Sequence, residues 1–227
     1  MFIRWRRTRD NISAGVNIEE VDYAGDEERR SNGNLSDQSH AARHKPTDRR
    51  RLLVPADMTL AQLHDVLQAA MGWEDGHMHE FSVSQRRIGR PNPEDRLMGM
   101  PSVESERTVR LSGILGRVGS KAIYTYDFGD SWEHSLVLEK RLPVDPNTPY
   151  PVCSDGQLAC PPEDCGGIPG FYDLVEALSD ANHERHEEML DWIGEFDPQA
   201  FSVESVNRML TPLRRRRNTS RGRVPTR

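Results

Sequence analysis

Residues 122–142, AIYTYDFGDSWEHSLVLEKRL, predict two β-strands joined by a tight turn. The first strand, 122–128, is rich in β-branched and aromatic residues, and Gly129-Asp130-Ser131 provides the turn before a second strand from Trp132 through Leu142. Alternation puts every second side chain on one face, namely Tyr124, Tyr126 and Phe128 in the first strand and Trp132, His134, Leu136 and Leu138 in the second. This hairpin predicts an antiparallel sheet.

The chain before the hairpin predicts more strands and one helix. A short strand at 50–55 ends at a proline, and residues 80–84 and 86–89 predict a second hairpin. Between them, Thr59 and Gln62 have the spacing of a capping box, and apolar residues recur at helical spacing until Gly72. One early helix therefore starts after Thr59 and stops near Gly72.

The chain after the hairpin predicts a long ordered loop and then three helices. Residues 143–170 are rich in proline, glycine and cysteine, so we expect neither strand nor helix there. Helical spacing of apolar residues returns at 171–179, 184–193 and 203–210, the last capped by Ser202 and stopped by Pro212. Early strands and late helices predict an α+β fold: one compact domain with an antiparallel sheet, one early helix and three late helices.

The two ends differ from the middle in composition. Residues 1–48 have few apolar side chains and little periodicity, which predicts a disordered or loosely attached segment before a domain at 49–213. Residues 214–227 hold seven arginines and no acidic residue, which predicts a disordered tail. Residues 51–213 hold 13 basic and 27 acidic residues, a net charge of −14 that repels a phosphate backbone.

Composition also limits the compartment. Uncharged apolar runs extend only a few residues, which excludes a membrane-spanning helix, and no apolar segment follows the basic N-terminus as in a secretory signal. Three cysteines are an odd number and do not indicate a disulfide framework. We therefore expect a cytoplasmic, bacterial-type protein whose thiols are reduced.

The turn at 127–134 is the first candidate site. Asp127, Asp130 and His134 bring two carboxylates and an imidazole close in sequence, a combination that suits a divalent metal or acid–base catalysis. The alternative is structural: Asp130 bonds its own turn backbone and His134 packs beside Trp132. An Asp-Phe-Gly triplet also occurs here, but the other protein-kinase motifs are missing.

The cysteine-rich stretch is the second candidate site, and we call residues 153–167 the Cys loop. Cys153, Cys160 and Cys165 are candidate ligands for zinc or another divalent metal, with His134 or His77 as the fourth ligand. No Cys-x-x-Cys pair occurs, so three thiols packed as small apolar groups are the alternative. If both candidates form one site, at least one cysteine should lie within about 10 Å of Asp127, Asp130 or His134.

Three other polar motifs indicate little. On a strand, His77 and His79 would face the same side, as a partly exposed pair. His183-Glu184-Arg185-His186 is one residue shorter than the zinc-protease motif and predicts solvated helix residues. Arg214–Arg217 predicts at most weak, nonspecific contact with nucleic acid, since no aromatic residue follows to stack on bases.

Several segments together resemble the plasmid pRiA4b ORF-3-like family, over about residues 50–212. The resemblance is carried by LVPAD and TLAQLH at 53–64, MGWED and HMHEF at 71–81, YDFGDSWEH at 126–134, and ACPPEDCGG at 159–167. It continues through 186–188 and 196–198 to Val206-Asn207. The resemblance implies a compact α+β domain found on plasmids and as a passenger of insertion elements, in some cases labelled TnpR.

The resemblance implies no established activity. The TnpR label suggests a serine resolvase, but the chain has no catalytic serine–arginine cluster and no helix-turn-helix pattern. Similar proteins usually open with an apolar strand running into an Ile-Trp-Arg-Arg-like segment, where this chain has Asp48-Arg49-Arg50-Arg51. Either residues 1–48 supply that strand or the sheet lacks an edge.

The first hypothesis is therefore an accessory protein of plasmids or insertion elements, with no reaction assigned. The second is a metal-dependent enzyme, hydrolytic in type, that uses Asp127, Asp130, His134 and the Cys loop. The third is a nucleic-acid-binding module that acts through the arginine tail, which the acidic domain disfavours.

Overall fold

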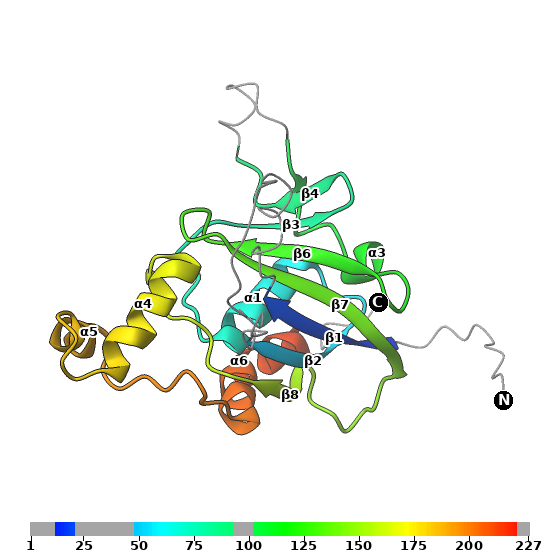
Figure 1. Cartoon of the computed structure of the whole chain (residues 1–227). Coiled ribbons are helices and arrows are strands. Elements are labelled where there is room, and N and C mark those ends of the chain that lie inside the picture. The colour runs from blue at the N-terminus through cyan, green and yellow to red at the C-terminus, as the bar shows by residue number, and fades with distance from the viewer. Residues whose placement is uncertain (1–11, 21–47, 93–101, 222–227) are drawn as a thin grey trace, which may run out of the picture.

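One large sheet organises the fold (Figure 1). The computed structural model describes residues 12–20, 48–92 and 102–221, with backbone only for 12–20 and 215–221. In these residues eight strands follow the order β5-β4-β3-β6-β7-β1-β2-β8, and five helices accompany them. The α+β class is confirmed, with one further short helix beyond the four predicted.

The hairpin of β6 (Lys121–Tyr126) and β7 (Trp132–Pro143) forms as predicted and lies inside the sheet. Tyr124 pairs with His134 across the two strands. Burial alternates along both, and the predicted inward faces are buried except at Phe128, which lies beyond the end of β6 and is exposed.

The strands on one side of this hairpin follow the sequence prediction. β3 (His79–Val83) pairs antiparallel with β6, and β4 (Arg86–Gly89) pairs antiparallel with β3. The two-residue β5 (Glu104–Ser105) adds to β4 in parallel. The sheet is therefore mixed at that edge rather than wholly antiparallel.

On the other side, the prediction that all of residues 1–48 are disordered or loosely attached is wrong for one segment. Residues Ile12–Glu20 form β1, which pairs antiparallel with both β7 and β2 (Arg49–Pro55). A strand bonded on both sides satisfies its backbone polar groups without a long apolar sequence. The other residues of 1–47 lie outside the described ranges. Residues 12–20 thus supply a strand that lies inside the sheet, between β7 and β2, and not at its edge.

The predicted loop at 143–170 also contains regular structure. Val152–Gln157 form β8, the edge strand beside β2, and α4 (Gly167–Ser179) begins four residues before the predicted start of its helix. Cross-strand pairing with β2 imposes the strand on a sequence that contains Ser154, Asp155 and Gly156.

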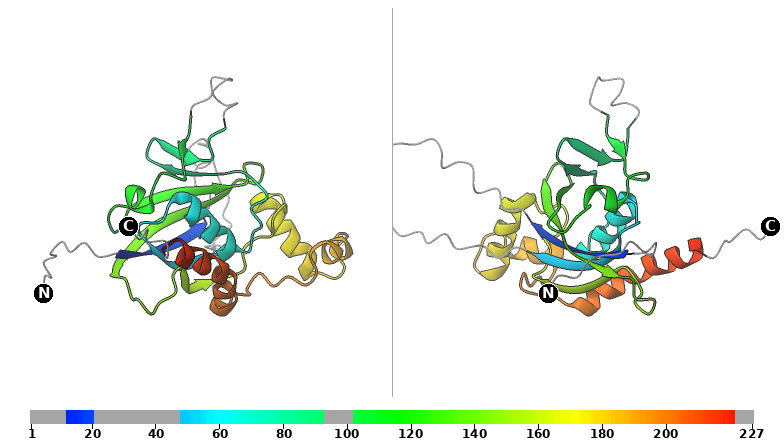
Figure 2. Two further views of the ribbon diagram at one scale, coloured as in Figure 1. Left: turned by 180° about the vertical axis from the view of Figure 1, so that it is seen from behind. Right: turned by 90° about the vertical axis from the view of Figure 1, so that its right-hand side faces the viewer.

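Helix α1 (Leu60–Met71) starts and ends as predicted. Thr59 and Gln62 form the capping box, and Gly72 ends the helix in the left-handed conformation at φ 84°. Helices α1 and α6 (Val203–Arg221) lie across one face of the sheet (Figure 2), and the core fills the space between. A four-residue helix, α3 (Leu111–Ile114), lies beside the residues that precede the N-terminus of α1.

Helix α6 extends well past its predicted end. Ser202 caps it as expected, with its Oγ accepting from the Ser205 N–H at 3.1 Å, but Pro212 lies within the helix and does not stop it. Part of the predicted disordered tail is therefore helical. Helix α5 (His186–Ile193) packs on α4, and this pair stands beside the β6–β7 turn (Figure 1). Among the described residues, no helix is long and apolar enough to cross a membrane.

Candidate functional site

The three hairpin residues predicted as a site do not converge. Asp127 and Asp130 lie in the β6–β7 turn, but His134 lies on β7 and points into the core, fully buried. The cause is the strand alternation that buries Trp132 and Leu136 on the same face. The carboxylate that accepts a hydrogen bond from the backbone of its own turn is that of Asp127, whose Oδ1 accepts from the Gly129 N–H at 2.9 Å. The structural alternative predicted Asp130 in this role, and that prediction is wrong.

The turn does meet the Cys loop, as predicted. Asp130 Oδ2 accepts from the Gly166 N–H at 3.1 Å, which places the adjoining Cys165 within the predicted distance of Asp130. This contact is tight, because a Cβ on Gly167 would lie 2.7 Å from the Asp130 carbonyl oxygen. The carboxylate thus accepts the backbone N–H just before α4, where the helix dipole favours negative charge.

His77 lies between the turn and the Cys loop. Its Nδ1 is 3.6 Å from Asp127 Oδ2, and its Nε2 is 3.1 Å from Asp164 Oδ1. One ligand atom from each of these three residues lies within 4.8 Å of the others. We call His77, Asp127 and Asp164 the junction site, since they come from the α1–β3 connection, the β6–β7 turn and the Cys loop.

The junction site is open on one side and rigid on the other. The side chain of His77 is 30% exposed and that of Asp164 is 71% exposed, whereas Asp127 is 12% exposed. Both aspartates have positive φ, 54° and 61°, a conformation that aspartate tolerates better than most residues. The site therefore combines one mostly buried carboxylate, that of Asp127, with two side chains that are open to solvent.

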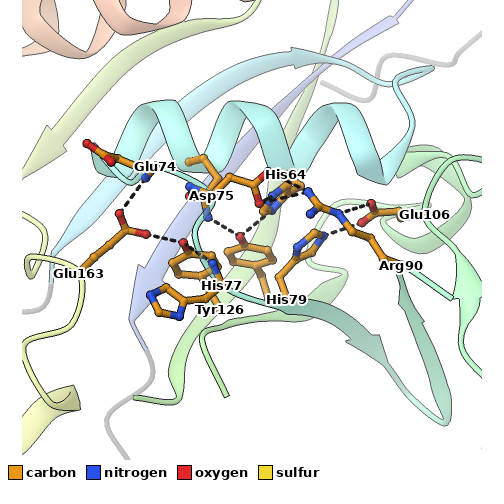
Figure 3. Close-up of polar contacts among 11 residues, drawn as sticks. His64, Glu74, Asp75, His77, His79, Arg90, Glu106, Tyr126 and Glu163 are labelled. Carbon is orange, nitrogen blue, oxygen red and sulfur yellow. Dashed lines mark hydrogen bonds and ion pairs between the residues drawn. The ribbon is translucent and has the colours of Figure 1, made fainter. Parts of the chain in front are cut away.

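Buried aromatic residues support the site from below (Figure 3). Tyr126 donates its hydroxyl proton to Glu163, whose other oxygen accepts from the Glu74 N–H at 2.9 Å. Burial, together with this bond to Glu163, raises the pKa of Tyr126. Trp73 stacks on Tyr126 and donates its indole N–H to the Pro161 carbonyl at 2.9 Å. These bonds hold the Cys loop against the end of α1.

A second polar cluster lies deeper, and we call it the histidine network: His64, Asp75, His79, Arg90 and Glu106 (Figure 3). The imidazoles of His64 and His79 stack with centroids 3.5 Å apart and planes 8° from parallel. His64 lies 2.8 Å from Asp75, and His79 lies 2.5 Å from Glu106. Arg90 bonds Asp75 at 2.9 Å and approaches Glu106 at 3.5 Å.

Burial and hydrogen bonding together set the charges of this network. Burial, reinforced by His79, lowers the pKa of His64 to about 4, so His64 is neutral at pH 7. For Glu106, burial acts to raise the pKa, but the hydrogen bond and charge of His79 outweigh it and lower the pKa. Two carboxylates thus face stacked imidazoles and one arginine in the interior.

The histidine network is poorly suited to a metal. Parallel stacked rings direct their nitrogen lone pairs side by side rather than at one point. His64 already uses both nitrogens, on Asp75 and on the Tyr124 hydroxyl at 2.8 Å. The network is therefore a buried, hydrogen-bonded support for β3 and α1, in which His79 Nδ1 has no hydrogen-bond partner among the described residues.

The structure does not bring the three cysteines together. Cys153 lies on β8, where its thiol bonds the Asp155 carbonyl at 3.3 Å and burial raises its pKa. Cys160 packs under α1, and Cys165 packs between the main core and α4. Strand, core and helix start separate the sulfurs, and no disulfide joins them. A zinc site made of all three is not formed.

Sequence reasoning found His77 as a possible ligand and Asp127 as a candidate site residue, but it did not join the two and it missed Asp164. The Pro-Pro-Glu-Asp-Cys segment signals a rigid acidic loop, yet only the folded chain puts Asp164 against His77. The expectation that His77 and His79 share a face is wrong, because β3 begins at His79. His79 is buried and His77 lies in the preceding connection.

The arginine tail begins with a side chain that is occupied within the domain. Arg214 donates to the Pro151 carbonyl at 2.9 Å and to Asn207 Oδ1 at 2.7 Å. The other arginine side chains of the tail lie outside the described residues. Arg214 is therefore part of the α6 packing rather than a solvated contact for nucleic acid.

Known proteins resemble this chain across most of its length. The profile of the family described as plasmid pRiA4b ORF-3-like protein matches residues 41–205. The uncharacterized protein y4hQ of Sinorhizobium fredii (strain NBRC 101917 / NGR234) is 37% identical over 171 residues, 74% of this chain and 86% of that protein. A crystal structure of MM3350, a protein of unknown function from Methanosarcina mazei Go1, has a TM-score of 0.68 at 30% identity, covering 86% of this chain and 97% of that one. The predicted family resemblance is confirmed, and the names of these relatives assign no reaction.

Proposed function

We propose, from the premise that the chain belongs to the plasmid pRiA4b ORF-3-like family, that it is a metal-binding accessory protein of plasmids or insertion elements. It holds a divalent ion such as zinc at the junction site. The observation that carries the proposal is the meeting of one imidazole and two carboxylates, from three separate connections, within 4.8 Å.

The spacing of these groups supports an ion. His77 Nε2 and Asp164 Oδ1 are 3.1 Å apart, as expected for two ligands each about 2.1 Å from one zinc ion. Asp127 contributes Oδ2, because its Oδ1 is bound to the turn backbone. One imidazole with two carboxylates suits zinc or manganese better than a thiol-preferring ion.

The environment suits a cation as well. Glu163 and Asp130 lie in the same junction and add negative charge around it. Because three protein groups leave coordination positions to water, a bound ion would supply a polarised water molecule there. Hydrolytic chemistry is the reaction class that this arrangement serves.

Zinc titration of the full chain by isothermal calorimetry tests the proposal. We expect two variants, His77→Ala and Asp164→Asn, each to bind one zinc equivalent fewer than the wild-type protein. Matched controls are His183→Ala, a half-exposed histidine in the α4–α5 connection, and Asp191→Asn, an exposed residue of α5; both should bind like wild type. Equal zinc binding by His77→Ala and wild type would overturn the proposal.

We also propose that the protein acts in the cytoplasm. The support is that no disulfide joins the three cysteines, two of which are buried. Thiol titration of denatured, freshly purified protein should count three reduced cysteines, and a stable disulfide would contradict this placement.

A further inference from the structure

Basic side chains gather at the end of the sheet opposite the junction site. Residues 110–121, which we call the basic loop, comprise the short helix α3 and its connection to β6. They include Arg110, Arg117 and Lys121, all exposed, and no acidic residue. Figure 1 shows α3 at one end of β6 and β7, whereas α4 and α5 stand at the other end. Positive charge is thus concentrated at the α3 end.

A fourth cation, from β7, joins the basic loop. Arg141 Nη2 donates to the carbonyls of Leu115 and Gly116, at 3.2 Å and 2.6 Å, so its guanidinium lies against the loop. Arg110 Nη1 donates to the Asp57 carbonyl. Each of these arginines uses one nitrogen on backbone carbonyls, and its other nitrogens have no hydrogen-bond partner among the described residues. The carbonyls therefore fix both guanidinium groups and leave donors for a ligand.

No carboxylate neutralises this charge within the described part of the chain. None of the ion pairs there involves one of the four cations, which are Arg110, Arg117, Lys121 and Arg141. The carboxylates closest to them in the sheet are already occupied. Glu139 pairs with Arg51 at 2.7 Å, and Glu104 pairs with Arg86 at 2.8 Å. The four cations together therefore create a positive potential that attracts an anion.

Hydrogen bonds hold the basic loop in one conformation. The Arg117 N–H donates to Ser120 Oγ at 3.2 Å, and the Ser120 N–H donates back to the Arg117 carbonyl at 2.9 Å. The Gly119 N–H donates to the Leu138 carbonyl at 2.9 Å, and the Leu138 N–H donates to the Ser120 carbonyl at 3.0 Å, which joins the loop to β7. The backbone that carries the cations is thus ordered before a ligand binds, which lowers the entropic cost of binding.

A concentration of acidic charge lies at the other end of the molecule. Residues 171–197, which contain α5 and most of α4, hold nine acidic residues and one arginine. On β7, Arg141 is nine residues from Trp132, which is about 30 Å at about 3.3 Å per residue. Charges that far apart are screened from each other at physiological ionic strength, where the Debye length is about 8 Å. The net charge of −14 over residues 51–213 therefore does not describe the potential at the basic loop.

We propose that the basic loop, together with Arg141, binds the phosphate backbone of double-stranded DNA. Arginine and lysine are the side chains that neutralise phosphate groups, and the fixed guanidinium groups keep free donors for phosphate oxygens. Residues 110–121 contain no aromatic side chain on which unpaired bases could stack, so a duplex is the expected ligand and not a single strand. Contacts to phosphate alone carry no sequence information, so the binding is nonspecific.

Fluorescence anisotropy of a labelled DNA duplex, titrated with the full chain at several salt concentrations, tests the proposal. For four phosphate contacts, the logarithm of the wild-type binding constant should fall with the logarithm of salt concentration at a slope of about −3.6. The double variant Arg117→Glu/Lys121→Glu should bind at least about tenfold more weakly, with a slope reduced by about 2. The matched control, Arg87→Glu/Arg185→Glu, reverses two exposed charges elsewhere and should bind within about twofold of wild type.

A measurement on wild-type protein covers the case in which a variant fails to fold. The duplex should slow acetylation of Lys121 at least about threefold, as read by peptide mass spectrometry, and salt at about 1 M should abolish this protection. His77→Ala should bind the duplex like wild type, so this test is independent of the junction site.

Four results would overturn the proposal. The first is a wild-type protein that shows no salt-dependent DNA binding or no protection of Lys121. The second is a double variant that binds as tightly as wild type, which would assign the contact to the arginines that follow residue 214. The third is tighter binding of a single strand of equal length. The fourth is salt-sensitive self-association that the double variant loses, without DNA binding, because the basic loop would then hold the acidic α4–α5 pair of a second copy.

Discussion

The junction site and the histidine network use the same side-chain chemistry in opposite ways. His77 and His79 are two residues apart, and each faces carboxylates, yet the side chain of His77 is 30% exposed and that of His79 is 0% exposed. In the network, Arg90 and close hydrogen bonds balance the carboxylates. At the junction, no arginine or lysine contributes an ion pair among the described residues. The difference indicates that the network maintains the fold and that the junction is available to a ligand.

The largest expected effect is on stability when the network is broken. His79→Ala should lower the free energy of unfolding by about 3–5 kcal/mol, because it removes the close hydrogen-bond partner of the buried Glu106 carboxylate and leaves Arg90 at 3.5 Å. His77→Ala should lower it by less than about 1 kcal/mol, since its surroundings are half-exposed. Urea denaturation followed by circular dichroism measures both. Equal losses in the two variants would erase the distinction between the regions.

The second-largest expected effect is a loss of folding stability as the pH falls. The pKa of His64 is about 4 in the folded protein against 6.5 for an ordinary histidine, so the unfolded chain takes up the proton first as pH falls. Stability is therefore complete above about pH 6.5 and falls by about 3 kcal/mol as the pH approaches 4. Below that range, Asp75 and Glu106, whose pKa values are lowered, add a further loss.

Denaturation at pH 7 and pH 5 measures this effect. The His64→Gln variant should be less stable at pH 7 but should lose much less on acidification. A wild-type stability that is flat between these two pH values would show that the network does not hold His64 neutral.

A third prediction displaces the Cys loop without touching the network. A Cβ on Gly170 would lie 1.9 Å from the Cys165 carbonyl oxygen, so Gly170→Ala must shift the start of α4. We expect a loss of about 1–3 kcal/mol and weaker zinc binding at the junction. Gly113→Ala, in helix α3 with no atom within 4 Å of the new Cβ, is the matched control. Unchanged zinc affinity in Gly170→Ala would show that the position of the Cys loop does not affect zinc binding at the junction site.

The smallest expected effect is on stability at the open end of the junction. Asp164→Asn should change the free energy of unfolding by less than about 0.5 kcal/mol, because its side chain is 71% exposed. A loss above about 2 kcal/mol by urea denaturation would assign Asp164 to the folding core instead.

The sequence predicted the elements whose signals are local. The capping box at Thr59, the stop at Gly72 and the central hairpin depend on near neighbours, and the structure confirms them. Strands β1 and β8 were missed because pairing partners far along the chain form them. Ile12, Ala14, Val16 and Ile18 do alternate, but the polar composition of residues 1–48 hid this short pattern.

The candidate sites were also predictable only in part, because they depend on contacts between segments that are far apart in the sequence. The contact between the β6–β7 turn and the Cys loop was expected from two polar segments, but the groups that make it were not: Asp130 accepts from the Gly166 N–H, and His77 lies between Asp127 and Asp164. His134 is close in sequence to Asp130, yet strand alternation turns it into the core, where it meets Asp48 instead. Proximity along the chain does not predict proximity of side chains across a strand.

Imidazole nitrogen chemical shifts during zinc titration test the central claim most directly. In long-range ¹H–¹⁵N correlation spectra of the full chain, the first zinc ions should shift the ring resonances of His77, while those of His64 and His79 stay in place. His77→Ala identifies the signal by its absence, and His183→Ala provides the matched control. Zinc-dependent shifts at His64 or His79 with none at His77 would contradict the division between an open junction site and a closed histidine network.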